Sequence, residues 1–162
     1  MNEPQHIVAF TGHRTYDHTA DEALCKIVAT LYRQGCRIFR SGMAEGFDLA
    51  AAEAVIQLKE HNNDIKLELY IPWPRFAERF SAQDQARYQA ILNHADIVRY
   101  TASDYHSAVF HRRNDMLVEG AGHIVAWWDG SQSGTRYTVS RARRSGSIIY
   151  NLYPDPQLNL ML

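Results

Sequence analysis

The sequence of 162 residues lacks the features that mark several large classes of protein. It has two cysteines, Cys25 and Cys36, whose spacing fits no zinc motif and which cannot build a disulfide framework. No stretch approaches the roughly 20 apolar residues that cross a bilayer. The N-terminus also lacks the basic region and the apolar run of a signal peptide. We therefore expect a reduced, cytoplasmic protein with no membrane partner.

An excess of charge of one sign is missing too. The formal net charge is -1, so no overall basic field draws nucleic acid to the chain, which argues against nucleic acid as a partner. The 8 histidines contain no H-x-x-x-H pair, and we expect no metal site.

Three common site motifs are absent as well. The chain has no G-x-G-x-x-G dinucleotide fingerprint and no Walker phosphate loop, which requires G-K-[ST]. It also has no G-x-S-x-G elbow, so an α/β-hydrolase triad is unsupported. Any site must therefore be built from other residues.

Short apolar runs alternate with segments of helical periodicity along the chain. The apolar runs predict strands over residues 6–12, 37–42, 66–72, 96–100, 123–128 and 147–152. The periodic segments predict helices over residues 19–34, 47–60, 81–94, 106–120 and 135–145. Such alternation is typical of right-handed βαβ crossovers. We expect an α/β fold of three layers, Rossmann-like and doubly wound, with a mainly parallel sheet of five or six strands and a single domain over residues 1–162.

The turn after the second predicted strand, residues 41–48, contains two glycines. Gly42 and Gly46 allow a tight turn and a close approach of the backbone to a ligand. The helix that begins near Phe47 presents free N–H groups, which favour an anion. Asp48 can accept a hydrogen bond from a ligand hydroxyl, or can simply favour the helix N-terminus. The other candidates of this turn are Ser41, Met43 and, as a weaker one, Glu45.

Polar residues also follow the first and fifth predicted strands. Arg14 can pair with a phosphate or be a solvated arginine, and His13 has no visible partner for a role as general base. The N–H groups of Gly134 and Thr135, with the Thr135 hydroxyl, can surround a phosphate, although an N-cap explains them too. Because ligands bind at the carboxyl ends of parallel strands, we expect one pocket here. Its candidates are Thr11, Gly12, His13, Arg14, Asp129, Gly130, Ser131, Gly134 and Thr135.

Three further residues are weaker candidates. Trp73, between two prolines after the third predicted strand, is the aromatic residue best placed to stack on a base. Arg113 and Asn114 lie in the predicted helix 106–120, where residues 112–115 cannot all share one face and surface salt bridges are the simpler expectation. The apolar tail, residues 154–162, either docks on the domain or packs on a second subunit, which leaves a homodimer open.

Several of these segments together resemble the YpsA-like proteins of the SLOG superfamily, which includes the DNA-processing protein DprA and the cytokinin-activating LOG proteins. The resemblance covers residues 6–152 and is carried by Thr11-Gly12-His13-Arg14, the run SGMAEGFDLAAAEAV from Ser41 to Val55, Arg113-Asn114, and Trp128-Asp129-Gly130-Ser131 leading to Gly134-Thr135. It implies a Rossmann-like fold that binds a nucleotide or a nucleotide-derived ligand related to NAD or ADP-ribose. Gly46 and Asp48 match the residues proposed to contact the ligand in the family.

One departure from the LOG enzymes bears on catalysis. Their motif is P-G-G-x-G-T-x-x-E, whereas here Ser131 to Thr138 lacks the double glycine and Thr138 stands in place of the catalytic glutamate. We therefore expect a binder or sensor of a nucleotide-like small molecule, without catalysis and without a required cofactor. A nucleotide N-glycosidase or phosphoribohydrolase, in which Asp48 or Glu45 replaces the glutamate, is the alternative. DNA binding by analogy with DprA is a third hypothesis.

Overall fold

A sheet of six strands forms the middle of the computed structural model, which describes residues 6–155. Its strands are β1 (Ile7–Gly12), β2 (Ile38–Ser41), β3 (Lys66–Ile71), β4 (Ile97–Tyr100), β5 (His123–Trp127) and β6 (Ile148–Asn151). They lie in the order β4-β3-β2-β1-β5-β6, and every pairing is parallel. The intervening α-helices are α1 (Asp21–Arg33), α2 (Phe47–Lys59), α3 (Ala82–His94), α4 (Val109–Val118) and α5 (Gly134–Arg144). The expected α/β architecture is confirmed, with a sheet that is parallel throughout.

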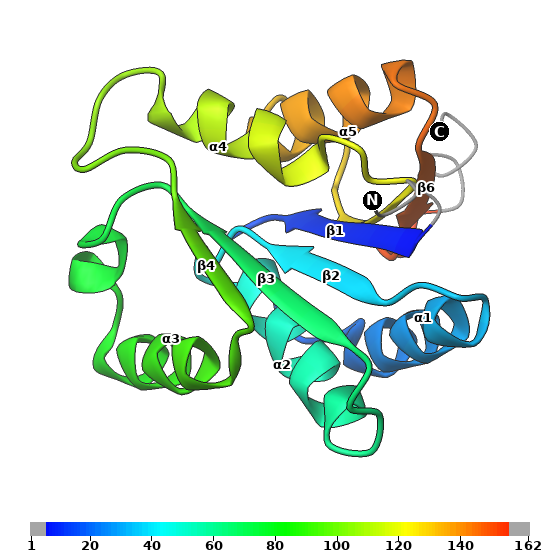
Figure 1. Cartoon of the computed structure of the whole chain (residues 1–162). Coiled ribbons are helices and arrows are strands. Elements are labelled where there is room, and N and C mark those ends of the chain that lie inside the picture. Colours follow the sequence, from blue (N-terminus) through cyan, green and yellow to red (C-terminus); the bar gives the residue numbers. More distant parts are fainter. Residues whose placement is uncertain (1–5, 156–162) are drawn as a thin grey trace.

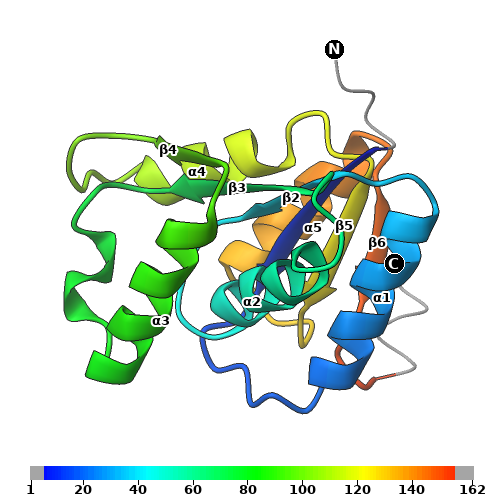
Figure 2. The ribbon, with the colours of Figure 1, turned by 60° about the horizontal axis from the view of Figure 1, so that its bottom comes forward.

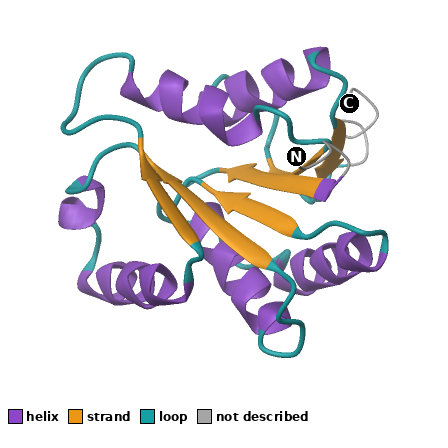
Figure 3. Cartoon of the chain, viewed as in Figure 1, coloured by secondary structure: helices purple, strands orange, loops and turns teal. Residues whose placement is uncertain are grey.

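Helices cover both faces of this sheet. Helices α1, α2 and α3 lie on one face and α4 and α5 on the other, as Figure 1 shows and as the colouring of Figure 3 makes plain. In the turned view of Figure 2, α2 lies in front of the sheet and α5 behind it. After β4, at one edge, the chain crosses the sheet to add β5 beside β1. The strand order therefore reverses between β1 and β5, the place where doubly wound folds bind ligands.

The apolar pattern explains why these segments take their places. All five residues of β5 are buried, as are Ile7 to Thr11 of β1, because helices pack on both faces of a parallel sheet. On α1, Leu24, Val28 and Leu31 form the buried stripe that faces the sheet.

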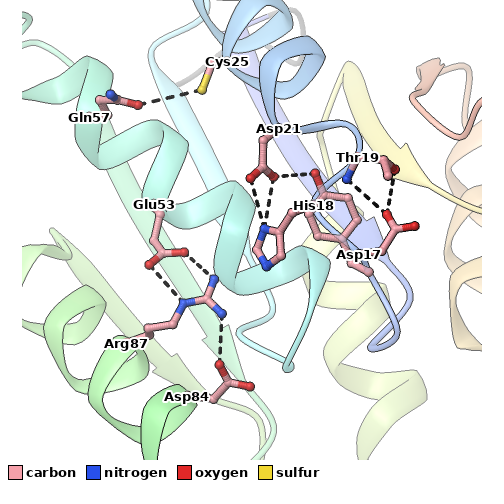
Figure 4. Close-up of polar contacts among 10 residues, drawn as sticks. Asp17, His18, Thr19, Asp21, Cys25, Glu53, Gln57, Asp84 and Arg87 are labelled. Atoms are coloured by element: carbon pink, nitrogen blue, oxygen red, sulfur yellow. Dashed lines mark hydrogen bonds and ion pairs between the residues drawn. The ribbon is translucent and has the colours of Figure 1, made fainter.

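Polar contacts tie the three helices of one face together (Figure 4). Arg87 of α3 makes a bidentate pair with Glu53 of α2, with Nη2–Oε1 at 2.5 Å and Nε–Oε2 at 3.1 Å. The same guanidinium contacts Asp84 at 2.9 Å through Nη1. The Cys25 thiol of α1 forms no disulfide and donates a hydrogen bond to the Gln57 side-chain oxygen of α2 at 3.8 Å. These contacts lie away from the switch between β1 and β5.

The loop after β3 contains one element that sequence periodicity did not predict. A short 3-10 helix, η2 (Phe76–Arg79), follows the prolines at 72 and 74. Four residues are too few to show a period. Among residues 6–155, no helix is long and apolar enough to cross a membrane, and no group of three or more His, Cys, Asp or Glu side chains could hold a metal. Of the predicted apolar tail, residues 156–162 lie outside the described part of the chain.

Candidate functional site

A cavity of about 430 Å³ opens at the carboxyl edge of the sheet, at the switch between β1 and β5. We call it the first cavity. The turn after β1, the beginning of α2, the inner side of α4 and the beginning of α5 line it, through Thr11, Gly12, His13, Arg14, Ala44, Asp48, Phe110, His111, Arg113, Asn114, Leu117, Ser133, Gly134 and Thr135. Because β2, β1 and β5 are neighbours, the turns that follow them converge here, as the sequence predicted.

Asp48 supplies the carboxylate of the first cavity. Its side chain is buried, and Oδ2 accepts a hydrogen bond from the Ala44 N–H at 3.2 Å. Oδ1 is also buried and has no hydrogen-bond partner among the described residues. Burial raises the pKa of Asp48 to about 6, although the Arg113 guanidinium, the Ala44 N–H and Arg14 act in the opposite direction. One acceptor of this carboxylate is therefore unsatisfied within the described chain.

Arg113 lies beside Asp48 and is buried, with 6% of its surface exposed. Its Nη1 donates to the Gly42 carbonyl at 2.5 Å and its Nε to the Asn114 side-chain oxygen at 2.8 Å. Nη2 has no protein acceptor within residues 6–155, so its two N–H groups are left for a ligand. Burial lowers the pKa of the guanidinium, and the neighbouring Asp48 raises it.

The expectation that residues 112–115 lie at the surface and form salt bridges there is wrong for Arg113 and Asn114. Arg113 and Asn114 are both buried and both line the first cavity. Asp115, on another side of α4, does make the surface contacts, with Arg141 at 3.0 Å and Tyr137 at 2.8 Å. The crossing of the chain from β4 to β5 lays α4 along the switch, which helix periodicity alone does not reveal.

Replacing Gly42 with alanine is expected to displace Arg113. A Cβ at this position would lie 2.7 Å from Arg113 Nη1 and 2.9 Å from its Cζ, closer than atoms pack. The guanidinium, as the end of a flexible side chain, is the group that would move. We expect anion binding in the first cavity to weaken roughly tenfold or more, with loss of a charge-assisted hydrogen bond. Calorimetric titration of the variant with inorganic pyrophosphate measures the change, and an affinity equal to that of the wild type would contradict it.

Other polar groups of the turn between β2 and α2 form hydrogen bonds within the protein. The Ser41 hydroxyl donates to the Asp48 carbonyl at 2.9 Å and accepts from the Met43 N–H at 3.2 Å. Met43 is fully buried, and the Phe47 N–H donates to the His13 carbonyl at 3.2 Å. Among the N–H groups at the beginning of α2, that of Phe47 is thus already used, while an anion at the others remains a prediction.

Several candidates of this turn consequently lie outside the first cavity. Gly42 and Gly46 fold against Arg113 and against the backbone of the β1 turn, while Ser41 and Met43 point into the structure. Glu45 borders a neighbouring cavity instead. Their assignment as ligand contacts remains a prediction.

The beginning of α5 faces the first cavity with N–H groups that the helix itself does not use. Ser133 is the N-cap, and its hydroxyl accepts from the Arg136 N–H at 3.2 Å. The N–H groups of Gly134 and Thr135, in the first turn, have no partner within the helix. They carry the positive end of the helix dipole and border the first cavity with the Thr135 side chain.

His13 has a carboxylate partner, contrary to the expectation that it has none. Its Nε2 lies 2.9 Å from Asp129 Oδ1 and 3.1 Å from the Asp129 N–H. Ser131 donates to the same carboxylate from its hydroxyl at 2.6 Å and its N–H at 3.0 Å, which holds the pKa of Asp129 below its ordinary value. Asp129, held by Ser131, therefore positions His13, and Asp129, Gly130 and Ser131 all lie outside the first cavity.

The lining also includes residues that sequence reasoning missed. Ala44, Phe110, His111, Leu117 and Ser133 all border the first cavity. Phe110, His111 and Leu117 come from α4, so the missing signal was the strand order that places this helix over the switch. Trp73 lies outside the first cavity, 5.7 Å from the Phe110 ring between centroids.

Comparison with known protein families identifies the family of this chain. The YpsA family model, described as the YspA SLOG family, matches residues 5–150. The chain belongs to this family. Among YpsA relatives, the SPbeta prophage-derived protein YoqJ of Bacillus subtilis (strain 168) is 29% identical over 149 residues, covering 83% of this chain and 87% of that protein. A UPF0398 protein of Bacillus cereus (strain B4264) is 27% identical over 157 residues, covering 88% and 85%.

Two solved structures share the fold of this YpsA protein. DNA processing protein A (DprA) from Streptococcus pneumoniae is 21% identical with a TM-score of 0.66, and the match covers 88% of this chain but 48% of that one. DprA from Helicobacter pylori, described with its single-stranded DNA binding mode, is 16% identical with a TM-score of 0.65 and coverages of 88% and 63%. The YpsA chain thus spans about half to two thirds of the length of these proteins.

Proposed function

We propose that the first cavity binds the phosphate of a nucleotide or nucleotide-derived ligand, and that the protein acts as a binder or sensor of that ligand. The observation that carries the proposal is the buried Asp48 Oδ1, which has no partner in the described chain and belongs to a residue that lines the first cavity. A buried acceptor without a partner costs free energy until a donor reaches it. A ligand hydroxyl, such as that of a ribose, is such a donor.

The charges around Asp48 support a phosphate beside that hydroxyl. Arg14 and Arg113 border the first cavity, and Asp48 is the one carboxylate among its described lining residues. The N–H groups at the beginning of α5 add further positive potential. An anion with several acceptor oxygens matches this set of donors.

Cleavage of the ligand has less support than binding. Thr138, at the place of the catalytic glutamate of the LOG motif, is fully buried and donates its hydroxyl to the Gly134 carbonyl at 2.9 Å. A phosphoribohydrolase would have to use Asp48 instead. Release of free base from nucleoside monophosphates, abolished by Asp48→Asn, would replace the sensor proposal with this enzymatic one.

Binding of single-stranded DNA is a second candidate function, favoured by one observation. Helix α5 carries Arg136, Arg141, Arg143 and Arg144 and no acidic residue. Together with the shared fold of DprA, this basic helix could extend the first cavity along a phosphate backbone. DNA affinity that falls steeply with salt, and falls further when Arg136 and Arg144 are both changed to glutamine, would support this candidate.

The nucleotide proposal is tested by comparing two neighbouring arginines. Melting temperatures with NAD, ADP-ribose, AMP, GTP and cyclic dinucleotides identify a ligand by its stabilisation of the folded chain. For that ligand, Arg113→Gln is expected to lower the affinity about 10- to 150-fold, because charge-assisted hydrogen bonds are worth about 1.5 to 3 kcal/mol. Arg112→Gln is the matched control, since Arg112 is exposed and lies outside the first cavity.

A second variant separates binding from folding. Arg113 holds the Gly42 carbonyl, so its loss can also destabilise the chain. Thr135→Val keeps the side-chain shape and removes only the hydroxyl beside the first turn of α5. Equal affinities of wild type, Arg113→Gln and Thr135→Val, measured by calorimetry on folded protein, would contradict the phosphate site.

A further inference from the structure

A second cavity, of about 560 Å³, adjoins the first one. Arg14 and Phe110 border both cavities, so a single ligand can extend from one into the other. The second cavity lies between the loop after β3, which contains Trp73, and the loop after β4, which contains Tyr105. Each volume is within the range of small-molecule pockets, roughly 300 to 1,000 Å³.

Aromatic rings form the wall of this second cavity. Trp73 packs edge-on against Phe76 at 5.3 Å, Tyr105 at 5.7 Å and Phe110 at 5.7 Å between ring centroids. Phe80 extends the cluster, 5.3 Å from Phe76. Tyr105 is 62% exposed, more than Val98, Tyr100 or Ile148, the other large apolar side chains on the surface of the described chain. The cluster thus offers ring surface at the mouth of a cavity, where a flat aromatic group can stack.

Arg14 marks the junction between the two cavities. Its guanidinium carbon lies 5.7 Å from the centroid of the Phe110 ring. No carboxylate of residues 6–155 lies within salt-bridge distance of it, although the side chain is exposed. A charged guanidinium that contacts no carboxylate directly, placed between the proposed phosphate site and an aromatic wall, suits a ligand with an anionic group next to an aromatic one.

The polar rim of the second cavity adds acceptors. Glu45 and Asp104 both border it. Glu45 accepts a long hydrogen bond from the Ser81 N–H at 3.4 Å and also interacts with Asp84, and Asp104 accepts one from the Tyr105 N–H at 2.8 Å. Because ionised carboxylates only accept, they favour a ring that carries N–H donors over one that carries acceptors alone.

We propose that the second cavity binds the aminopurine base of the ligand whose phosphate lies in the first cavity, with the base against Trp73 and Tyr105. This inference rests on the proposed function and names its substrate class, a purine nucleotide with an exocyclic amino group. Arg14 lies where the sugar-phosphate part of that ligand passes from one cavity to the other.

Calorimetric titration with AMP, GMP, IMP and ribose 5-phosphate tests the proposal on the full chain. We expect AMP or GMP to bind more tightly than IMP, which lacks the amino group, and than ribose 5-phosphate, which lacks the base. Tyr105→Ala is expected to weaken binding of the better aminopurine nucleotide roughly 5- to 150-fold, the range for loss of base stacking. The same variant should bind ribose 5-phosphate with unchanged affinity.

Tyr100→Ala is the matched control, because Tyr100 is also an exposed tyrosine, at 45%, and borders neither cavity. Equal loss of affinity in the two tyrosine variants would overturn the base site, as would equal binding of ribose 5-phosphate and of both aminopurine nucleotides. After either of those results, the proposed phosphate site would still stand if Arg113→Gln weakened the binding of ribose 5-phosphate. Absence of binding by all four compounds and by the other nucleotides screened would instead overturn the proposed function itself.

Discussion

Replacing Gly46 with alanine is expected to lower the free energy of unfolding by at least about 3 kcal/mol. Gly46 has a φ of +83°, a region that side chains rarely adopt. A Cβ there would lie 2.5 Å from the Arg14 carbonyl oxygen and 2.6 Å from that of His13. These atoms belong to the backbone of the turn after β1 and cannot swing aside as a side chain can. Urea denaturation followed by circular dichroism measures the loss.

Gly120 and Gly146 provide matched controls for this variant. Both also have positive φ, +72° and +89°, but a Cβ at either position would meet no atom within 4 Å. Gly120→Ala and Gly146→Ala are therefore expected to cost only the backbone strain, about 1 to 2 kcal/mol. If Gly46→Ala proves no more destabilising than these two, the close packing of the β1 and β2 turns is not as described.

The same geometry affects how binding data on Gly46 should be interpreted. Gly46 precedes α2 and packs against the backbone of His13 and Arg14 in the turn after β1. Those two residues line the first cavity. A Gly46 variant that fails to bind a ligand would therefore report a displaced turn rather than a lost ligand contact. Arg113 and Thr135 are better positions for testing the site.

Asp48 is expected to make the stability of the folded chain depend on pH between about 4 and 6. Its pKa is raised by burial to about 6 from an ordinary 3.8, so in this range the folded chain binds more protons than the unfolded chain. The free energy of unfolding therefore falls as the pH rises through the window. Full ionisation costs on the order of 3 kcal/mol by the difference between the two pKa values.

Asp48→Asn isolates this effect from other titrating groups. Asparagine stays neutral and can still accept the Ala44 N–H through its side-chain oxygen. From pH 4 to pH 7, the free energy of unfolding of the wild type is expected to fall by roughly 2 to 2.5 kcal/mol relative to that of Asp48→Asn. Urea denaturation of both proteins at several pH values measures it. A difference that does not change with pH would show that Asp48 is not desolvated in solution.

The cost of ionising Asp48 also predicts how a ligand should act. A ligand hydroxyl that donates to the free Oδ1 stabilises the ionised form and so lowers the pKa of the carboxyl. Such a ligand would then raise the free energy of unfolding more at pH 7 than at pH 5. In Asp48→Asn this increase with pH would be smaller. The free-energy cost of ionising Asp48 in the unliganded protein is thus linked to the proposed binding.

The sequence by itself determined the elements and the edge of the sheet where the site lies. The apolar runs and helical periods are local patterns, so they predicted all six strands and all five α-helices of the described chain within a few residues of their ends. The turns after β1 and β5 could be identified as site candidates because, in a parallel sheet, ligands bind at the carboxyl ends of the strands.

Only the tertiary structure decided which side chains of those elements line the first cavity. The order of the strands brought α4 over the switch, and with it Arg113 and Asn114, which helix periodicity had left on the surface. Packing of the β1 and β2 turns gave the Phe47 N–H, at the beginning of α2, and the Ala44 N–H before it partners within the protein. Contacts of this kind join segments far apart in the chain, and they depend on complementary shapes and charges that no local pattern records.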